Sequence, residues 1–261
     1  MKRVLVTGAN GQLVLAIKGA AADYPQLSFV FAKKTDLDVR DAQQIEAFFK
    51  VNRFDFCINA AAYTNVDKAE EEVDKAYALN ELAPRLLAEA CKQHSVFFIH
   101  ISTDYVFDGT KGVPYTTADK PNPINVYGAS KLAGEQAIAA VGGDYCIVRT
   151  SWLYSEFGSN FQTKILEKTK AQPFLEVVCD LYGTPTYAPN LVVFLLNKLT
   201  KSAFASNMEH FSGGETMSWY DLAKKIVGEG ARIKKVEVIA LNLKASRAKN
   251  TALSTESINI N

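Results

Sequence analysis

A tyrosine and a lysine four residues apart, Tyr127 and Lys131, have the types and spacing that point most directly to chemistry. On a helix this spacing places both side chains on one face. A nearby ammonium group favours the phenolate, so the pKa of Tyr127 is expected to fall below its usual value of about 10. Such a tyrosine can protonate a carbonyl oxygen while hydride reaches the carbon. A surface Tyr and Lys on a helix is the alternative explanation of this common pattern.

A hydroxyl group for the same reaction is supplied by Ser102-Thr103-Asp104, which follows an apolar run. Thr103 could hydrogen-bond the carbonyl oxygen and orient it. Together with a glycine turn near the N-terminus, this segment disfavours the surface explanation. Thr103, Tyr127 and Lys131 are therefore the predicted catalytic residues.

The glycine turn is Thr7-Gly8-Ala9-Asn10-Gly11-Gln12-Leu13-Val14, between a predicted strand and a predicted helix. Glycines permit a tight turn and a close approach of the backbone to a pyrophosphate, while the helix N-terminus supplies N–H donors. The segment predicts a dinucleotide site, with an ordinary strand-to-helix turn as the alternative. A third glycine would be expected where Val14 stands, so the helix should lie slightly farther from the sheet.

Residues after the second predicted strand concern the adenosine end of such a cofactor. Asp38 could accept a hydrogen bond from the adenine amino group and Val39 could pack on the ring, although an acid here also suits a helix N-cap. Lys33 and Lys34 stand where a 2′-phosphate would be attracted, which favours NADPH over NADH and leaves NADH open. The small residues of Asn59–Thr64 would let the backbone pass close to a flat cofactor.

The elements that must position these residues alternate between apolar strands and amphipathic helices. Continuous apolar strands between such helices predict an α/β fold with a doubly wound parallel sheet of the Rossmann type. The predicted strands are Val4–Thr7, Leu27–Ala32, Phe54–Ala60, Val96–Ile101, Tyr145–Arg149, Leu175–Cys179 and Val236–Ala240. The predicted helices are Gln12–Ala22, Asp41–Asn52, Val73–His94, Tyr187–Thr200 and Ser218–Val227, with another opening at Tyr127.

The last third of the chain mixes aromatic residues, Gly and Pro, which predicts a smaller C-terminal substrate lobe. Residues 1–150 and about 174–205 are assigned to an NAD(P)-binding Rossmann domain. Residues about 151–173 and 206–261 are assigned to the substrate-binding lobe. The segment Gly109–Asn125 contains three prolines and few periodic apolar residues, so it is predicted to be a functional loop.

Composition excludes several classes of function. The net charge is +1, from 29 basic and 28 acidic residues, so no nucleic-acid partner is expected. No stretch approaches the ~18 apolar residues of a membrane helix. The cysteines are widely spaced, which predicts buried free thiols and a reducing, cytoplasmic setting. No His, Cys or Asp cluster has the spacing of a metal site, so no metal is expected.

Longer segments resemble the extended short-chain dehydrogenase/reductases and, within them, the dTDP-4-dehydrorhamnose reductase family. The resemblance covers nearly the whole chain to about Val227 and is most specific in two segments, Ser102–Gly109 (STDYVFDG) and Asn125–Glu135 (NVYGASKLAGE). The other matching segments are Asn59–Glu70, Arg149–Tyr154, Gly183–Thr186 and Trp219–Asp221.

The resemblance implies a reaction and roles for individual residues. The family uses NADPH to reduce the 4-keto group of dTDP-6-deoxy-L-lyxo-4-hexulose to dTDP-L-rhamnose, a precursor for cell-surface polysaccharide. Tyr127 would donate the proton, Lys131 would hold the nicotinamide ribose and tune Tyr127, and Thr103 would assist at the carbonyl. The implied cofactor-binding residues are Gly8, Asn10, Gly11, Gln12, Leu13, Asp38, Val39, Ala61, Ala62 and Thr64, besides Tyr127 and Lys131. The implied substrate-binding residues are Thr103, Asp104, Trp152 and Arg247.

Two departures from the family pattern lie near the C-terminus. Where the family carries an Arg-Pro pair, this chain has Arg247-Ala248, and it ends at Asn261, earlier than the family normally does. Both features predict weaker nucleotide binding. The alternatives are a reductase of another carbonyl substrate and a non-catalytic regulatory subunit of the same fold. The intact Thr103, Tyr127 and Lys131 favour an enzyme with a nucleotide-sugar substrate, and a homodimer is left open.

Overall fold

The centre of the computed structural model is a parallel sheet; residues 1–204, 207–228 and 232–255 are described. Six strands follow the order β10-β5-β4-β3-β1-β2, and every neighbouring pair is parallel. The strands are β1 (Lys2–Thr7), β2 (Leu27–Ala32), β3 (Phe56–Asn59), β4 (Phe97–Thr103), β5 (Tyr145–Thr150) and β10 (Met208–His210). The order reverses next to β1, which confirms the predicted doubly wound fold.

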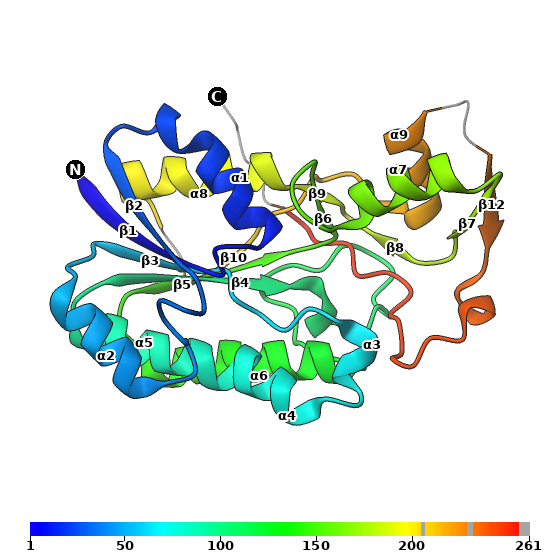
Figure 1. Cartoon of the computed structure of the whole chain (residues 1–261). Coiled ribbons are helices and arrows are strands. Elements are labelled where there is room, and N and C mark those ends of the chain that lie inside the picture. The colour runs from blue at the N-terminus through cyan, green and yellow to red at the C-terminus, as the bar shows by residue number, and fades with distance from the viewer. Residues whose placement is uncertain (205–206, 229–231, 256–261) are drawn as a thin grey trace.

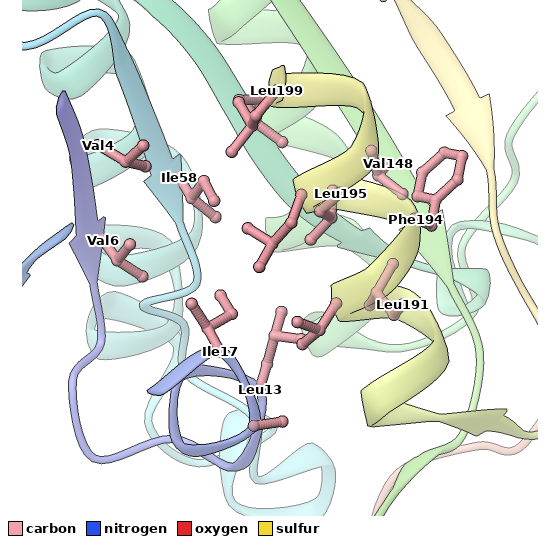
Figure 2. Packing of buried hydrophobic residues seen from close by; sticks show 14 of the residues in the cluster. Val4, Val6, Leu13, Ile17, Ile58, Val148, Leu191, Phe194, Leu195 and Leu199 are labelled. Carbon is pink, nitrogen blue, oxygen red and sulfur yellow. The ribbon is translucent and has the colours of Figure 1, made fainter. Parts of the chain in front are cut away.

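Helices cover both faces of this sheet (Figure 1). One face carries α1 (Gln12–Ala20) and α8 (Ala188–Lys201), and the other carries α2 (Ala42–Val51), α5 (Ala83–Gln93) and α6 (Val126–Val141). Between the sheet and the first pair lies a core in which β1, β3 and β5 face α1 and α8. Figure 2 labels Val4, Val6, Leu13, Ile17, Ile58, Val148, Leu191, Phe194, Leu195 and Leu199 in this core.

The predicted helix Val73–His94 is one continuous run with an irregular turn. It consists of α4 (Val73–Tyr77), a π-helical turn η2 (Ala78–Leu82) and α5. Pro84, at the start of α5, has no N–H to donate to the preceding turn of this run. Such turns often occur at functional sites. This one buries Asn80, whose side chain hydrogen-bonds to Tyr63 and Ser130.

The smaller lobe is built around a separate parallel pair, β7 (Leu175–Val178) with β12 (Ile233–Val236). The helices α7 (Phe161–Ala171) and α9 (Trp219–Val227) pack on it. The predicted strand Val236–Ala240 is wrong, because pairing ends at Val236. Asp180 then accepts a hydrogen bond from the Val238 N–H at 2.8 Å, at the start of the 3-10 turn η4 (Val238–Leu241).

Short elements complete the chain and connect the lobe to the sheet. The remaining strands are β6 (Leu153–Tyr154), β8 (Tyr182–Gly183), β9 (Thr186–Tyr187) and β11 (Met217–Ser218), and the remaining helical turns are η1 (Ala21–Asp23), α3 (Val66–Ala69) and η3 (Asp104–Val106).

Two strands lie on the other side of the predicted domain borders. β7, expected in the Rossmann domain, belongs to the lobe, whereas β10, expected in the lobe, forms an edge of the main sheet. Each strand is placed by its pairing partner, which is distant in sequence. Residues 205 and 206, at the predicted border, lie outside the described residues. The division into two units remains a proposal.

Two simple expectations concern cysteines and membranes. Cys57, Cys91 and Cys146 are buried free thiols, while Cys179 is free but only partly buried. Within the described ranges, no helix has the length and apolar character needed to cross a bilayer.

Candidate active site

A cavity of about 690 Å³ opens at the carboxyl ends of β1, β3 and β4. This is where the strand order reverses, the usual ligand position in doubly wound folds. The turn after β1 approaches the end of β3 closely. Gly8 has a φ of +78°, and a Cβ there would lie 2.9 Å from the carbonyl carbon of Ala60. Only glycine fits this turn, as the sequence predicted.

The N-terminus of α1 faces the same cavity. Gly11 is its N-cap and offers no side-chain partner to the first-turn N–H groups, which can therefore bind an anion. Val14 is fully buried in the core between sheet and helices, so the position expected to hold a glycine accommodates valine. The turn thus keeps the features of a pyrophosphate site.

Most of the predicted site residues line this cavity. They are Gly8, Asn10, Gly11, Gln12, Leu13, Ala61, Ala62, Thr64, Thr103, Asp104, Tyr127, Lys131 and Trp152, and Lys33 and Lys34 join them. Asp38, Val39 and Arg247 do not belong to the lining of this cavity. Asp38 instead accepts hydrogen bonds from Arg40, at 2.9 Å from Nε and 2.6 Å from Nη2, which lower its pKa to about 2. Val39 is buried in the core on the α2 and α5 face.

Tyr127 lies in the first turn of α6, after the N-cap Asn125, and its ring packs edge-on against Tyr105 at a centroid distance of 5.4 Å. The prediction that the pKa of Tyr127 falls is wrong for the protein without cofactor or substrate. Burial raises the pKa of Tyr127 to about 12, partly opposed by the Thr103 hydroxyl. Desolvation outweighs the effect expected from a nearby ammonium group, because removing water disfavours the phenolate.

Lys131 is directed toward the sheet. Its Nζ donates to the carbonyl oxygen of Ile101 at 2.8 Å and lies 3.0 Å from His100 Nε2. Burial lowers the pKa of Lys131 to about 8, with Glu135 acting in the opposite direction. The sequence gave no role to His100, and a histidine inside an apolar strand was the available signal.

Asp104 is buried beside Thr103 and connects three segments. Its Oδ2 accepts hydrogen bonds from Ser151 at 3.1 Å and Thr251 at 2.5 Å, and Thr103 donates to Oδ1 at 3.2 Å. Burial raises the pKa of Asp104 to about 6, although these hydrogen bonds oppose the shift. The C-terminal segment therefore reaches the centre of the candidate site through Thr251.

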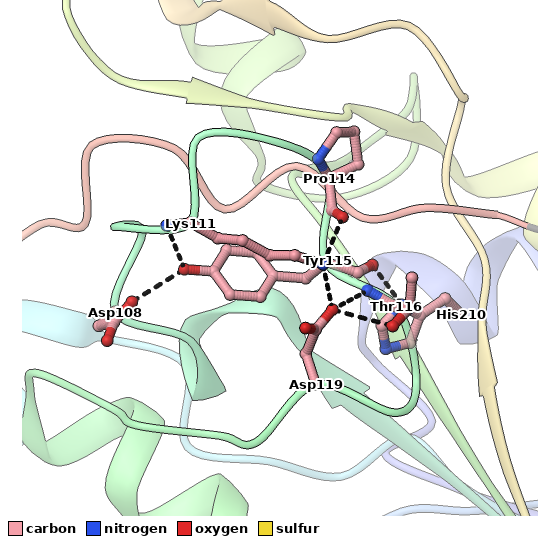
Figure 3. Close-up of polar contacts among 7 residues, drawn as sticks. All are labelled: Asp108, Lys111, Pro114, Tyr115, Thr116, Asp119 and His210. Carbon is pink, nitrogen blue, oxygen red and sulfur yellow. Dashed lines mark hydrogen bonds and ion pairs between the residues drawn. The ribbon is translucent and has the colours of Figure 1, made fainter.

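The predicted loop Gly109–Asn125 holds that C-terminal segment in place (Figure 3). Tyr115 is buried and donates from its hydroxyl to Asp108 at 2.8 Å, and its carbonyl oxygen accepts from His210 at 3.1 Å. The backbone of Tyr115 also pairs with Ala252 and Ser254. The loop thus acts on the cavity indirectly, through the residues that flank Thr251.

Two stacked indole rings close one side of the cavity. Trp152 has a left-handed backbone, with φ of +46°, and its ring lies on that of Trp219 with a centroid distance of 3.7 Å and an angle of 8°. Strained backbone of this kind persists where the surroundings hold it, often at ligand sites. Trp219 opens α9 and lines the same cavity. The sequence assigned it no site role, although it lay in a segment matching the family.

A second cavity of about 770 Å³ adjoins this side, lined by α7, β7, Tyr105, Trp219 and Arg247. Most of its lining is apolar, and Arg247 is held there by Asp67, whose Oδ2 lies 2.8 Å from Nη2. Tyr105 and Trp219 line both cavities, so a ligand could extend from one to the other. Arg247 lines the second cavity together with Tyr105 and Trp219.

Comparison with known proteins places the chain in a family. The model of the RmlD substrate binding domain matches residues 1–261. The chain belongs to this family. A dTDP-4-dehydrorhamnose reductase from Sinorhizobium fredii is 35% identical over 268 residues, covering 98% of this chain and 90% of the relative. One from Aggregatibacter actinomycetemcomitans is 36% identical, covering 92% and 83%.

Solved structures of family members have the same architecture. The dTDP-4-dehydrorhamnose reductase from Bacillus anthracis, in complex with NADP, superposes with a TM-score of 0.92 at 35% identity and covers 98% of this chain and 92% of its own. A UDP-glucose 4-epimerase from Thermus thermophilus, complexed with NAD, has a TM-score of 0.79 at 18% identity, covering 97% and 90%, and supports the Rossmann-type fold alone.

Proposed function

We propose that this protein is an NADPH-dependent reductase of the 4-keto group of dTDP-6-deoxy-L-lyxo-4-hexulose, forming dTDP-L-rhamnose. The observation that carries the proposal is that Thr103, Tyr127 and Lys131 line one cavity with the glycine turn after β1. Relatives named for this activity cover nearly the whole chain, and one of them is a structure with NADP.

The cavity has the features that an NADPH molecule requires. The glycine turn leaves room for a pyrophosphate beside the first-turn N–H groups of α1. Lys33 and Lys34 are exposed at the end of the cavity beyond β2, where they suit a 2′-phosphate. Bound NADPH supplies the hydride that adds to the ketone carbon.

The protein's own residues handle the ketone oxygen. Thr103 orients this oxygen with its hydroxyl group, and Tyr127 transfers its phenolic proton to it, so the product is the alcohol. A tyrosine whose pKa is about 12 holds this proton throughout the physiological range. Lys131 keeps a positive charge near the tyrosine that is being deprotonated and holds the nicotinamide ribose. Such a positioned acid accelerates a reaction by about 100-fold to 10,000-fold.

The substrate would extend over both cavities. Asp104 and Trp152 contact the hexulose beside Thr103, and Trp219 supports the Trp152 ring from behind. Arg247 meets the nucleotide in the second cavity. Asp38 and Val39 are proposed to lie near the adenine. To accept a hydrogen bond from the adenine amino group, Asp38 must give up hydrogen bonds from Arg40.

A second candidate substrate has its own support. A relative from Streptomyces niveus, 35% identical over 227 residues, is a dTDP-4-keto-6-deoxy-D-glucose reductase. This ketone would need the same proton donor, so the catalytic residues do not separate the two. The lining of the sugar site would have to do so.

An assay with purified protein tests the proposal. NADPH oxidation is followed with each of the two dTDP-4-keto sugars, and the configuration at C4 of the product is determined. We expect turnover of the lyxo-hexulose to a product with the rhamnose configuration. Turnover of the gluco substrate alone would replace the proposed substrate. NADPH binding without oxidation of either would favour the regulatory-subunit alternative.

Cellular setting and assembly remain predictions. A cytoplasmic location would give the enzyme access to NADPH, and a homodimer would be detected as twice the chain mass in sedimentation equilibrium.

A further inference from the structure

His100 is buried in β4 between two polar side chains from different elements. Its Nδ1 lies 3.0 Å from Asn59 Nδ2, at the end of β3, and its Nε2 lies 3.0 Å from Lys131 Nζ, on α6. The exposed fractions of Asn59 and His100 are both 0%, and that of Lys131 is 2%. Polar groups buried to this degree meet most of their hydrogen-bonding needs through contacts with one another.

The orientation of Asn59 follows from its other contacts. Its Oδ1 accepts a hydrogen bond from the backbone N–H of Ala61 at 3.2 Å and from the Thr7 hydroxyl at 2.7 Å. A backbone N–H can only donate, so the atom facing it must be the amide oxygen. The amide nitrogen therefore faces His100, and because this nitrogen can only donate, His100 Nδ1 must accept.

An imidazole that accepts at Nδ1 and is neutral carries its proton on Nε2. Burial lowers the pKa of His100 well below its usual value, so the ring is neutral. The Nε2–H group then points at Lys131 Nζ. Only an uncharged amine can accept this proton, since an ammonium group has no lone pair.

We propose that Asn59 and His100 are positioning residues for Lys131. Asn59 keeps the proton of the His100 imidazole on Nε2, and this Nε2–H group stabilises the uncharged amine of Lys131. When Lys131 is charged, Nε2 must accept instead, and the ring proton must move to Nδ1. Two donors then face each other in either orientation of Asn59. The Nδ1–H of His100 faces the amide NH2 group of Asn59, or, if the amide is flipped, that NH2 group faces the N–H of Ala61. Protonation of Lys131 is thereby coupled to the imidazole tautomer and to Asn59.

The charged groups around Lys131 are few. Glu135 lies on the same helix and is paired with Arg149 of β5, whose Nη2 is 2.6 Å from Oε2. Tyr127 precedes Lys131 on α6, and Asp104 in η3 acts on Tyr127. Burial disfavours the ammonium form of Lys131 and Glu135 favours it, and the net effect is a pKa lowered to about 8, close to the working pH.

The inference rests on the proposed reductase function. After Tyr127 has given its proton to the ketone oxygen, the phenolate must be reprotonated. A lysine whose uncharged form is stabilised releases a proton toward Tyr127 more readily. His100 and Asn59 would therefore assist the recovery of Tyr127 between turnovers without touching substrate or cofactor.

The first test needs neither substrate nor cofactor, so it can fail independently of the proposed function. The chain has three histidines, and the nitrogen signals of His100 are assigned in a 15N-labelled sample by comparison with His100→Gln. At about pH 9, above the pKa of Lys131, we expect the proton on Nε2 in the wild type. In Asn59→Asp, whose carboxylate accepts from Nδ1–H, we expect it on Nδ1. A wild-type proton on Nδ1 at this pH would overturn the proposal.

The second test uses the pH profile of kcat/KM at saturating NADPH. Activity should decline above the pKa of Lys131, because its charge favours deprotonation of Tyr127. His100→Gln and Asn59→Asp each remove the contact that stabilises the uncharged amine of Lys131. The pH above which kcat/KM declines should therefore rise by about one unit. His94→Gln, which changes a partly exposed histidine bound to Glu46, should leave it in place. An unshifted decline in both folded variants, with thermal unfolding as the folding control, would contradict the proposal.

Discussion

At the scale of single residues, Tyr127 illustrates how burial determines chemistry. Removing its phenol from water raises the pKa to about 12, so the hydroxyl stays protonated at neutral pH. A proton donor needs this state, whereas a tyrosine that acts as a base would need the opposite shift. The protonated phenol is the form from which Tyr127 can donate to the oxygen of a ketone.

Replacing Tyr127 with phenylalanine should lower kcat for the dTDP-4-keto sugar by about 100-fold or more, because a positioned acid is lost. NADPH affinity, measured by fluorescence titration, should change little, because the ring and its contact with Tyr105 remain. Tyr182→Phe is the matched control, since this tyrosine is exposed in β8. Turnover of the Tyr127 variant near the wild-type rate would remove Tyr127 from the mechanism.

Cofactor preference should depend on Lys33 and Lys34. Replacing both with serine should abolish a preference for NADPH over NADH, which is expected to be modest because exposed ion pairs contribute about 1 kcal/mol or less each. The dissociation constants of both cofactors are compared for the wild type, the double variant and Lys50→Ser, an exposed lysine on α2 paired with Glu46. Tighter binding of NADH than NADPH by the wild type would refute this interpretation of the lysines.

Two aspartates should give opposite dependences of stability on pH. Burial raises the pKa of Asp104 to about 6, so its favourable contribution is present below the unfolded pKa and is lost as pH rises through 6. Hydrogen bonds from Asn122, Thr110 and Tyr115 hold the pKa of Asp108 well below its usual range, so its contribution is present above the unfolded pKa and is lost as pH falls.

Urea unfolding at about pH 4 and about pH 7.5 checks this prediction. Relative to wild type, Asp104→Asn should gain up to roughly 3 kcal/mol between the lower and the higher pH. Asp108→Asn serves as the comparison and should lose only a little stability relative to wild type over the same interval, because most of the contribution of Asp108 is lost below pH 4. A change of the same sign in both variants would show the assignment to be wrong.

The sequence predicted residues well where they belong to a local motif. Tyr127, Lys131 and Thr103 were predicted from their spacing together with the glycine turn near the N-terminus, and all three line the cavity, while their catalytic roles remain predictions. The shifted pKa of Tyr127 was missed because desolvation depends on what surrounds the ring in three dimensions. His100 was missed for a similar reason, since its partners come from β3 and α6.

At the scale of elements, α6, which carries Tyr127 and Lys131, packs closely on the π-helical turn η2. A Cβ on Gly134 would lie 1.9 Å from the carbonyl oxygen of Asn80, which leaves no room for a side chain. Local periodicity predicted the helices on both sides of this contact. The contact itself depends on a π turn that hydrophobic spacing does not reveal.

Gly134→Ala should therefore destabilise the protein by about 1–3 kcal/mol, the usual cost of overpacking a core. Gly19→Ala is the matched control, because Gly19 is exposed near the end of α1 and a Cβ there makes only an ordinary contact, 3.7 Å from Phe157. This second change should stabilise the helix by up to about 1 kcal/mol. Both values come from urea unfolding, and an equal effect of the two substitutions would argue against the tight contact.

The pairing partners of the short strands could not be predicted from the sequence either. The runs of β1 to β5 were recognised because each is a continuous apolar segment between predicted helices. The pairing of β10 with β5 and of β7 with β12 was not predicted, because a short strand pairs wherever an edge is open and its partner is distant in sequence.

At the scale of the whole molecule, the C-terminal segment joins the two units. Asn125, the N-cap of α6, donates to the carbonyl oxygen of Ser246 at 2.9 Å, and Arg247 pairs with Asp67. Farther along, Thr251 binds Asp104 and Leu253 bridges to Tyr115. Asp104 and Arg247, which are proposed to bind the sugar and the nucleotide, thus both contact this stretch of chain or belong to it. Ala248, where the family has proline, faces Gly109, whose Cβ position lies 2.8 Å from the Ala248 Cβ.

Arg247 should decide how tightly the nucleotide end of the substrate binds. A charged hydrogen bond to a diphosphate contributes about 1.5–3 kcal/mol, so Arg247→Ala should raise KM for the dTDP-4-keto sugar by about 10-fold to 100-fold. Some of this remote binding energy orients the ketone in the first cavity, so kcat should fall by a smaller factor. The affinity for NADPH should stay constant, because Arg247 lines the second cavity rather than the first.

Lys244→Ala, which removes a neighbouring exposed cation paired with Glu71, is the control and should leave KM unchanged. Steady-state kinetics with varied sugar nucleotide separates the two constants. A fall in kcat with no rise in KM would place Arg247 at the reacting centre, and unchanged constants would move the nucleotide site elsewhere in the lobe.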